Sequence, residues 1–490
     1  MTILAFLWRR ITALASTLIL FVVVVALFLA YRWLSAGQQD NLVHVQEKRQ
    51  YLATIASTEP AVADMPNIIL VLYDDLGYGD IGAGAQGNLL NTPNIDALAA
   101  AGVTLSDFHS PAPVCTPSRA GIMTGRLPAR AGLPNVVFPS DTWKSFLINT
   151  VITPNSNVRL PEEEITLADV LQAAGYATGM VGKWHMGDRS PSLPNDMGFE
   201  QYFGALYSND MEPFALYRND KIEVAAPADQ DYLTEHYTRE ATQFIEQHSD
   251  EPFFLYFAHN FPHDPLHARE DRLGQSAGGL YGDVIEEIDD SIGEIVAVLE
   301  RTGNLESTLL LITSDNGPWF LGSAGNQRGR KGNTFEGGMR VPFIAHWPNR
   351  IPAGRTEPAM AMGTDLLPTV LDLLQLPAPT DRLLDGRSIL PVLTEGAVTP
   401  HDFLYYYDAK TLFAVRDQRF KYRAPAGVIY STDQSPIGGS MPQKEWLFDL
   451  AGDSHEAYDT SATYTEDADR LRKAFAAKNA EMKENTRGWR

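Results

Sequence analysis

Apolar runs and amphipathic segments alternate along most of the chain. Asn67 to Tyr73 is an almost continuous apolar run, which is typical of a strand buried on both faces of a parallel sheet. Asp96 to Gly102 then reads as a helix with a glycine stop. Further helices are predicted over 168–174, 237–248 and 284–301, and further strands over 177–181, 252–257 and 308–313. This alternation predicts an α/β fold with a large, mostly parallel mixed sheet flanked by helices.

The pattern changes near residue 395. Short segments with polar alternation over 401–423 and 446–450 read as strands, and 467–483 reads as a closing helix. We therefore predict two domains, a large α/β domain over 66–395 and a smaller C-terminal α+β domain over 396–490 with a short antiparallel sheet.

The N-terminus carries a second kind of apolar segment. Ile11 to Ala30 contains no charged residue and follows Arg9 and Arg10, which favours a membrane helix with its N-terminus in the cytoplasm. Residues 1–36 are predicted to be an uncleaved anchor, and 37–65 a spacer. A signal peptide cleaved near Ala36 is the alternative. Either interpretation predicts an exported body, anchored to the cytoplasmic membrane in the first case and facing the periplasm in a Gram-negative cell.

The net charge and the cysteine content limit which binding partners and covalent cross-links are expected. The 490 residues carry a formal net charge of −22, so the surface repels nucleic acid phosphates and no nucleic-acid partner is expected. An anion can still bind, but only where cationic side chains gather locally. The single cysteine, Cys115, excludes an intramolecular disulfide.

Acidic and amide side chains follow two of the predicted buried strands. Asp74 and Asp75 come directly after the first, and Asp315 and Asn316 come after the strand over 308–313. Ligands of open α/β sheets bind beyond the carboxyl ends of the strands. Oxygen ligands suit Ca²⁺, or Mg²⁺, rather than zinc. Either pair alone could also be an ordinary turn cap.

Cys115 lies in a segment with its own chemistry. Pro117 suits the first turn of a helix, which would put Cys115 near the helix N-terminus, where an anion is favoured. Arg119 would stand one turn further along. A lone cysteine is more often a small buried residue, so its neighbours decide its role.

Cys115-Thr-Pro-Ser-Arg119 followed by Thr124-Gly-Arg126 closely resembles the signature of the sulfatase family, whose cysteine is oxidised to formylglycine. Other family motifs are matched in order, between about residues 66 and 460. They are Asp74-Asp75 with Gly77 to Asp80, Gly182 to His185, Pro262 to His267, Ser314 to Gly317, Lys331-Gly332 with Glu336 to Pro342, and Trp446 to Leu450. The resemblance implies an alkaline-phosphatase-like fold and a sulfuric ester hydrolase of the arylsulfatase type.

The resemblance also implies a metal and a modified nucleophile. Asp74, Asp75, Asp315 and Asn316, together with modified Cys115, would hold Ca²⁺ against a sulfate oxygen. One hydroxyl of the hydrated aldehyde would attack sulfur while the alcohol leaves. The second hydroxyl would then expel sulfate. Maturation would require a formylglycine-generating enzyme as a partner.

The remaining roles implied by the resemblance belong to cations and proton carriers. Arg119, Lys183 and Lys331 would offset charge on the transferring group. His185 would hold or deprotonate the diol, and His263 would protonate the leaving oxygen. Ser208 matches a sulfate-contacting position, and Lys183, His263 and Lys331 would also contact substrate. His109, His267 and His346 are interpreted as residues outside the site, although His267 is close enough to His263 in the sequence to support it.

Two other functions stay open on the sequence. A phosphonate monoester or phosphodiester hydrolase of the same superfamily would use a similar site, and a membrane-bound binding protein could keep the fold without turnover. The expected substrate is a sulfated small molecule or glycan, aryl or carbohydrate. Segments 136–159 and 318–330, the latter with Trp319 and Phe320, are expected to line the mouth of the site.

Overall fold

The large sheet forms the centre of the protein. The structure, a computed structural model, describes residues 2–35, 40–58, 65–82, 89–140, 142, 157–425 and 444–490. Within them, a ten-stranded sheet has its parallel strands in the middle and antiparallel pairs toward each side. In sheet order the strands are β11 (Arg355–Glu357), β2 (Val103–Leu105), β10 (Phe343–His346), β9 (Thr308–Ser314), β1 (Asn67–Tyr73), β8 (Phe253–Ala258), β4 (Ala177–Gly182), β5 (Gln201–Gly204), β6 (Leu216–Arg218) and β7 (Lys221–Val224).

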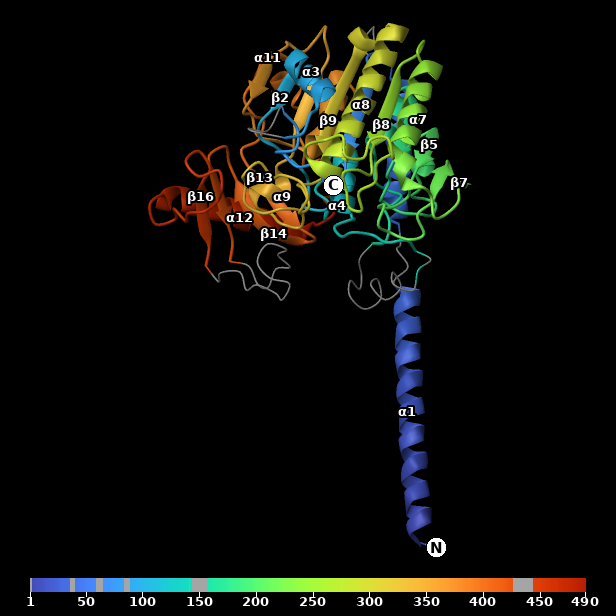
Figure 1. Cartoon of the computed structure of the whole chain (residues 1–490). Coiled ribbons are helices and arrows are strands. Elements are labelled where there is room, and N and C mark those ends of the chain that lie inside the picture. The colour runs from blue at the N-terminus through green and yellow to red at the C-terminus, as the bar shows by residue number, and fades with distance from the viewer. Residues whose placement is uncertain are drawn as a thin grey trace.

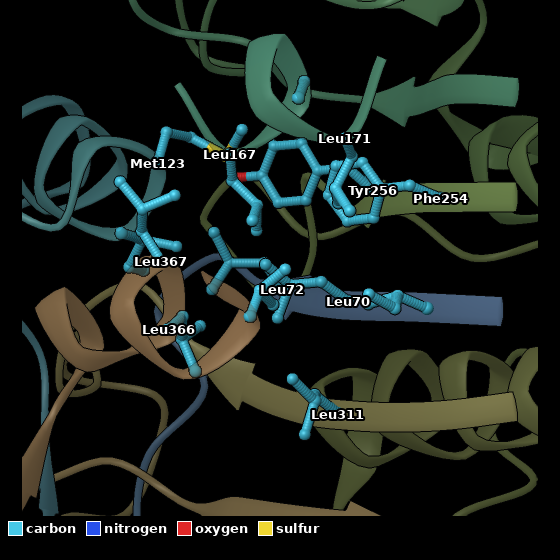
Figure 2. Packing of buried hydrophobic residues seen from close by; sticks show 14 of the residues in the cluster. Leu70, Leu72, Met123, Leu167, Leu171, Phe254, Tyr256, Leu311, Leu366 and Leu367 are labelled. Carbon is cyan, nitrogen blue, oxygen red and sulfur yellow. The ribbon is translucent and has the colours of Figure 1, made fainter. Parts of the chain in front are cut away.

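Helices cover both faces of this sheet (Figure 1). Alternate residues of β1 point to opposite faces, as strand geometry requires. Ile69 and Val71 join a buried cluster with α3 (Pro93–Ala101), α7 (Leu233–Gln247) and α8 (Gly279–Thr302). Figure 2 shows the other face, where Leu70 and Leu72 pack with residues of three further helices. These helices are α4 (Cys115–Thr124), α6 (Leu167–Ala173) and α10 (Leu366–Leu373).

A separate antiparallel sheet follows in the C-terminal part of the chain, beside the large body (Figure 1). Its strands are β13 (Leu404–Asp408), β14 (Thr411–Arg416), β15 (Phe420–Arg423) and β16 (Trp446–Asp449), and α12 (Thr465–Glu484) packs on β14 and β15. The remaining short elements are β3 (Phe108–His109), β12 (Ala361–Met362), α9 (Glu336–Met339), α11 (Leu390–Glu395) and the 3₁₀ turns η2 (Pro194–Met197), η3 (Gln230–Tyr232), η4 (Leu305–Ser307) and η5 (Gly363–Asp365).

Two helices precede the body. α1 (Thr2–Ser35) extends away from it as a single long helix (Figure 1). Many of the apolar side chains of α1 are exposed. Among the described residues, none of the helices combines the length and hydropathy needed to cross a membrane. α2 (Leu42–Ser57) lies within the predicted spacer and packs against α6, where Lys48 Nζ lies 2.8 Å from Asp169 Oδ2.

The predicted fold class is confirmed. The mostly parallel mixed sheet, its flanking helices and the small antiparallel sheet are all present. The strand over Asn67–Tyr73 is found with the predicted bounds, and the other predicted helices and strands of the body are found with ends shifted by a few residues. The domain boundary at residue 395 stays a prediction. Residues 141 and 143–156 of the predicted mouth, and 37–39 and 59–64 of the predicted spacer, lie outside the described residues.

Candidate active site

Four neighbouring parallel strands deliver the predicted site residues from their carboxyl ends. In the order β9, β1, β8 and β4, these ends lead into Asp315, Asp74, His263 and Lys183. The register aligns Tyr73 with Ser314, and the strand-end backbones stay bonded to each other beyond the strands. The amide of Asp315 donates to the carbonyl oxygen of Tyr73 at 3.0 Å. Residues far apart in sequence therefore meet at one edge of the sheet, as expected for an α/β crevice.

The oxygen-bearing residues form a buried group. Asn316 Nδ2 donates to Asp75 Oδ1 at 2.6 Å, and the amide of Asp75 lies 3.3 Å from Asp315 Oδ1. Asp74 Oδ1 and Asn316 Oδ1 are buried without a hydrogen-bond partner. Burial and the neighbouring Asp74 carboxylate raise the pKa of Asp315 to about 7. Unpartnered buried oxygens and crowded carboxylates are what a bound divalent cation would relieve.

Cys115 is the first residue of α4 and reaches this group. One ligand atom from each of Asp74, Asp75, Cys115 and His263 can be chosen so that all four lie within 4.8 Å of one another. Cys115 is buried, and this burial together with the Asp74 carboxylate raises the pKa of its thiol to about 12. An unmodified Cys115 is therefore a thiol near neutral pH, with little nucleophilic thiolate.

Three cations surround the carboxylates. Arg119 is fully buried; its Nε donates to Asp315 Oδ2 at 2.9 Å, and its Nη1 donates to the Lys183 carbonyl oxygen at 2.6 Å. Lys183 Nζ donates to Asp74 Oδ2 at 2.5 Å, and Lys331 Nζ donates to Asp75 Oδ2 at 2.8 Å. These charges are the local concentration of cations that an anion site on an acidic protein requires.

The two histidines occupy different positions. His185 is buried, its Nε2 lies 3.0 Å from the Val137 carbonyl oxygen, and its Nδ1 has no partner. Burial, then the charge of Lys183, lowers its pKa well below the usual value. His263 is partly exposed, with Nε2 3.9 Å from Asp75 Oδ2 and 3.4 Å from Ser208 Oγ. Ser208 also accepts a hydrogen bond from Lys183 Nζ at 3.1 Å.

A cleft opens directly above these residues. Its volume is about 310 Å³, and its lining residues are Asp75, Asp210, His263, Asp264, Trp319 and Lys331. Trp319 belongs to a segment that the sequence places at the mouth. The sequence interpretation missed Asp210 and Asp264, although each stands within two residues of a motif position and could have been found by that proximity.

All of the predicted site residues therefore lie in one region. The three histidines that the sequence analysis placed outside the site have other surroundings. His267 Nδ1 pairs with Asp231 Oδ1 at 2.8 Å, and His346 lies on β10. His109 is fully buried against Asp107, with 2.9 Å between Nε2 and Oδ1. Trp184, which lies between Lys183 and His185, is buried in the core.

Comparisons with known proteins identify the family. A family described as sulfatase matches residues 66–376, and a family described as the C-terminal part of N-sulphoglucosamine sulphohydrolase matches residues 330–428. The first match covers both acidic strand ends, Cys115 and the two histidines. The second begins just before Lys331 and runs across β13, β14 and β15.

Named relatives agree with this assignment. The canine N-acetylgalactosamine-6-sulfatase is 38% identical over 73% of this chain and 71% of its own length. Human arylsulfatase A is 36% identical over 81% of this chain and 84% of its own length.

Solved structures agree as well. The PsFucS1 sulfatase from Pseudoalteromonas sp. has a TM-score of 0.76 at 27% identity, covering 91% of this chain and 95% of that one. A phosphonate monoester hydrolase from Agrobacterium radiobacter shares the fold, with a TM-score of 0.59 at 20% identity over 86% of this chain and 95% of that one. The chain belongs to the sulfatase family, and it is a sulfuric ester hydrolase of the arylsulfatase type.

Proposed function

We propose that this sulfatase hydrolyses sulfate monoesters of carbohydrates or aryl alcohols with a formylglycine made from Cys115 and a bound Ca²⁺. The observation that carries the proposal is the position of Cys115. It begins α4 and reaches the same point as the acidic strand ends, with three cations around them. A sulfate group needs these elements together, namely a nucleophile, a Lewis acid and charge compensation.

The residues at the strand ends fit a hard divalent cation. Asp74, Asp75, Asp315 and Asn316 offer carboxylate and amide oxygens, which Ca²⁺ and Mg²⁺ prefer. The unpartnered Asp74 Oδ1 and Asn316 Oδ1 support this interpretation. When bound, Ca²⁺ would supply Lewis-acid polarisation of a sulfate oxygen. We favour Ca²⁺ because its coordination shell tolerates a larger and less regular set of oxygens than that of Mg²⁺.

The chemistry of Cys115 favours its modification. Its buried thiol has a pKa of about 12, so an unmodified side chain offers little nucleophile. A formylglycine at this position would supply a hydrated aldehyde, with one hydroxyl to attack sulfur once a base removes its proton and a second hydroxyl to expel sulfate afterwards. We propose a formylglycine-generating enzyme as the maturation partner that oxidises Cys115.

The chain's own side chains would orient the ester and move protons. Lys183 donates to Ser208, so both can contact one sulfate group, and Lys331 stands at the open cleft. Arg119 is hydrogen-bonded to Asp315 and would offset negative charge on the transferring sulfate group from the buried side of the site. His263 is the imidazole that lines the cleft, which suits protonation of the leaving oxygen. His185, with Nδ1 unpartnered, suits holding or deprotonating a hydroxyl at position 115.

Relatives support a carbohydrate or aryl substrate. The canine relative is an N-acetylgalactosamine-6-sulfatase and the human relative is arylsulfatase A. The structure called Ps i-CgsB, with a TM-score of 0.71 at 27% identity over 85% of this chain and 93% of that one, was solved in complex with k-i-k-neocarrahexaose. In this chain the cleft presents Trp319, which could stack on a sugar or an aryl ring.

We separately propose that the catalytic body acts outside the cytoplasm. The uncharged segment from Ile11 to Ala30 after Arg9 and Arg10 supports export of the body. Whether residues 1–36 are retained can be read from the mass of the mature chain in a membrane fraction and in a soluble fraction.

The test compares leaving-group-matched esters. The full chain, co-expressed with a formylglycine-generating enzyme and supplied with Ca²⁺, is assayed for kcat/KM on an aryl sulfate, the matching aryl phosphate and the matching phosphonate monoester. The aldehyde at position 115 is verified by mass spectrometry, and Cys115→Ala is the matched inactive variant. A preference for the sulfate that disappears in Cys115→Ala supports the proposal. A preference for the phosphorus esters would favour the hydrolases of the same superfamily.

A further inference from the structure

The cleft above the site has two different zones of charge. Its inner part holds His263 and Lys331, and Lys331 is already bonded to Asp75. Its outer part carries Asp210 and Asp264, whose side chains are both exposed. Among the described lining residues, the rim therefore contributes two carboxylates and no additional cation. A substrate bound in this cleft therefore meets the two carboxylates as well as the cations.

The chain segments that carry the two rim carboxylates are joined by hydrogen bonds of their neighbouring residues. Asn209, next to Asp210, is buried, and its Nδ2 donates to the Pro265 carbonyl oxygen at 2.8 Å. The Asn209 carbonyl oxygen accepts a hydrogen bond from Gln230 Nε2 at 3.0 Å. The first bond ties the segment of Asp210 to the segment of Asp264, and the second ties it to the segment of Gln230. The two negative charges therefore sit on a fixed framework at the cleft, rather than on independent surface loops.

Trp319 completes the rim with an aromatic surface. The ring is partly buried and meets Phe320 edge to face, with 4.7 Å between ring centroids. Arg330 Nη1 donates to the Trp319 carbonyl oxygen at 2.9 Å and to the Gly322 carbonyl oxygen at 2.7 Å. The backbone under the ring is thus anchored. An indole that lines the same cleft as two hydrogen-bond acceptors is suited to the apolar face and the hydroxyl edge of a sugar ring.

We propose that Asp210 and Asp264 select a sulfated sugar whose neighbouring groups are hydroxylated and uncharged, and that they disfavour uronates and additional sulfates. This inference rests on the proposed function. The carboxylates accept hydrogen bonds from ring hydroxyls while Trp319 stacks on the ring. A second anion beside the scissile sulfate meets two like charges instead. For a separation near 8 Å in a partly screened cleft, this repulsion corresponds to about a fivefold to tenfold loss in kcat/KM.

The experiment uses two sulfated disaccharides that differ only in one group. In the first, a neutral hexose flanks the sulfated sugar, and in the second the corresponding uronic acid takes its place. Pairs sulfated at the 3-, 4- and 6-positions are assayed with the full, formylglycine-containing chain and Ca²⁺, alongside an aryl sulfate. Wild type is compared with Asp210→Asn/Asp264→Asn. The matched control is Asp220→Asn/Asp250→Asn, which changes the net charge equally at two other exposed carboxylates.

The expected result is a wild-type preference of about fivefold or more for the neutral partner, which added salt weakens because the repulsion is screened. The rim variant should raise kcat/KM for the uronate several-fold more than for the neutral partner, while the control variant keeps the wild-type ratio. Equal rates on both disaccharides, or a ratio that the rim variant leaves unchanged, would overturn the inference and leave the sulfatase function standing. Absence of sulfate release from every ester, including the aryl sulfate, would overturn the proposed function and the inference with it.

Discussion

Replacing the buried ammonium group of Lys421 on β15 with an uncharged side chain should strongly lower the free energy of unfolding. The side chain is fully buried, and Nζ lies 3.0 Å from Glu336 Oε1 and 3.0 Å from Glu456 Oε1. Lys421→Met keeps an apolar stem of similar length and removes the charge. Glu336 retains Arg416 at 3.1 Å, whereas the described residues give Glu456 no second ion pair. The variant therefore leaves the buried Glu456 carboxylate without an ion-paired partner, and the charge of Arg423 is the nearby cationic charge that still acts on it.

The loss of folding stability in Lys421→Met can be estimated from the protonation of Glu456, which is the simplest way for the variant to avoid an unpaired buried charge. The ordinary pKa of a glutamate is 4.5, and burial already raises the pKa of Glu456 above this value with Lys421 in place. Keeping Glu456 protonated at pH 7 therefore adds a loss of up to about 3.4 kcal/mol, since each pKa unit corresponds to about 1.36 kcal/mol. That value agrees with the ~3–5 kcal/mol measured when buried ion pairs lose one partner. In the variant the folded state binds this proton more tightly than the unfolded chain, so the loss shrinks to about 1.4 kcal/mol at pH 5.5.

Urea unfolding at pH 7 and pH 5.5, followed by circular dichroism and tryptophan fluorescence, measures both values. Lys444→Met is the matched control, because Lys444 is 67% exposed and pairs with Asp459 at 3.1 Å. Its loss should stay below about 1 kcal/mol. Adding Glu456→Gln to Lys421→Met should remove the pH dependence of the loss. The reasoning is refuted if Lys421→Met loses less than about 1 kcal/mol at pH 7, or loses the same amount at both pH values.

Three further predictions concern the site and its surroundings. His263→Ala should lower kcat/KM for a sugar sulfate by about 10²-fold or more but for an aryl sulfate by less than about tenfold, because a phenolate leaves without a proton. Equal losses in released sulfate would contradict that role. Ca²⁺ at about 100 times its Kd should stabilise the wild type by roughly 2.7 kcal/mol in thermal unfolding, and Asn316→Leu should abolish most of this gain; an unchanged gain in the variant would remove Asn316 from the ligand set. Burial lowers the pKa of His259 from 6.5 to about 3, so the folded state binds its proton less well than the unfolded chain. Below pH 6.5, this group should lower the free energy of unfolding by up to about 1.4 kcal/mol for each pH unit, as measured by guanidinium unfolding. The free energy of unfolding of the His259→Asn variant should fall less steeply with decreasing pH. Equal slopes in the two proteins would contradict the assignment.

Local sequence patterns predicted many of the helices and strands. Asn67–Tyr73 forms β1 with the predicted bounds because every residue in it is buried, and a continuous apolar run records burial on both faces directly in the sequence. The long amphipathic helix α8 was predicted for the same kind of reason. Short elements such as β6 and β7 were not predicted, because three or four residues carry too little periodicity and depend on their partners.

The sequence by itself determined the chemistry-bearing residues, since Cys115, the acidic pairs and the two histidines stand in motifs that can be read locally. Only the tertiary structure decided how they meet. Lys331 and Asp75 are separated by 256 positions, yet they form a hydrogen bond at the edge of the sheet. The acidic rim of Asp210 and Asp264 likewise combines two segments, which the hydrogen bond from Asn209 to Pro265 joins across 56 positions. Such contacts depend on strand order and helix packing across the whole chain, which no local stretch of sequence encodes.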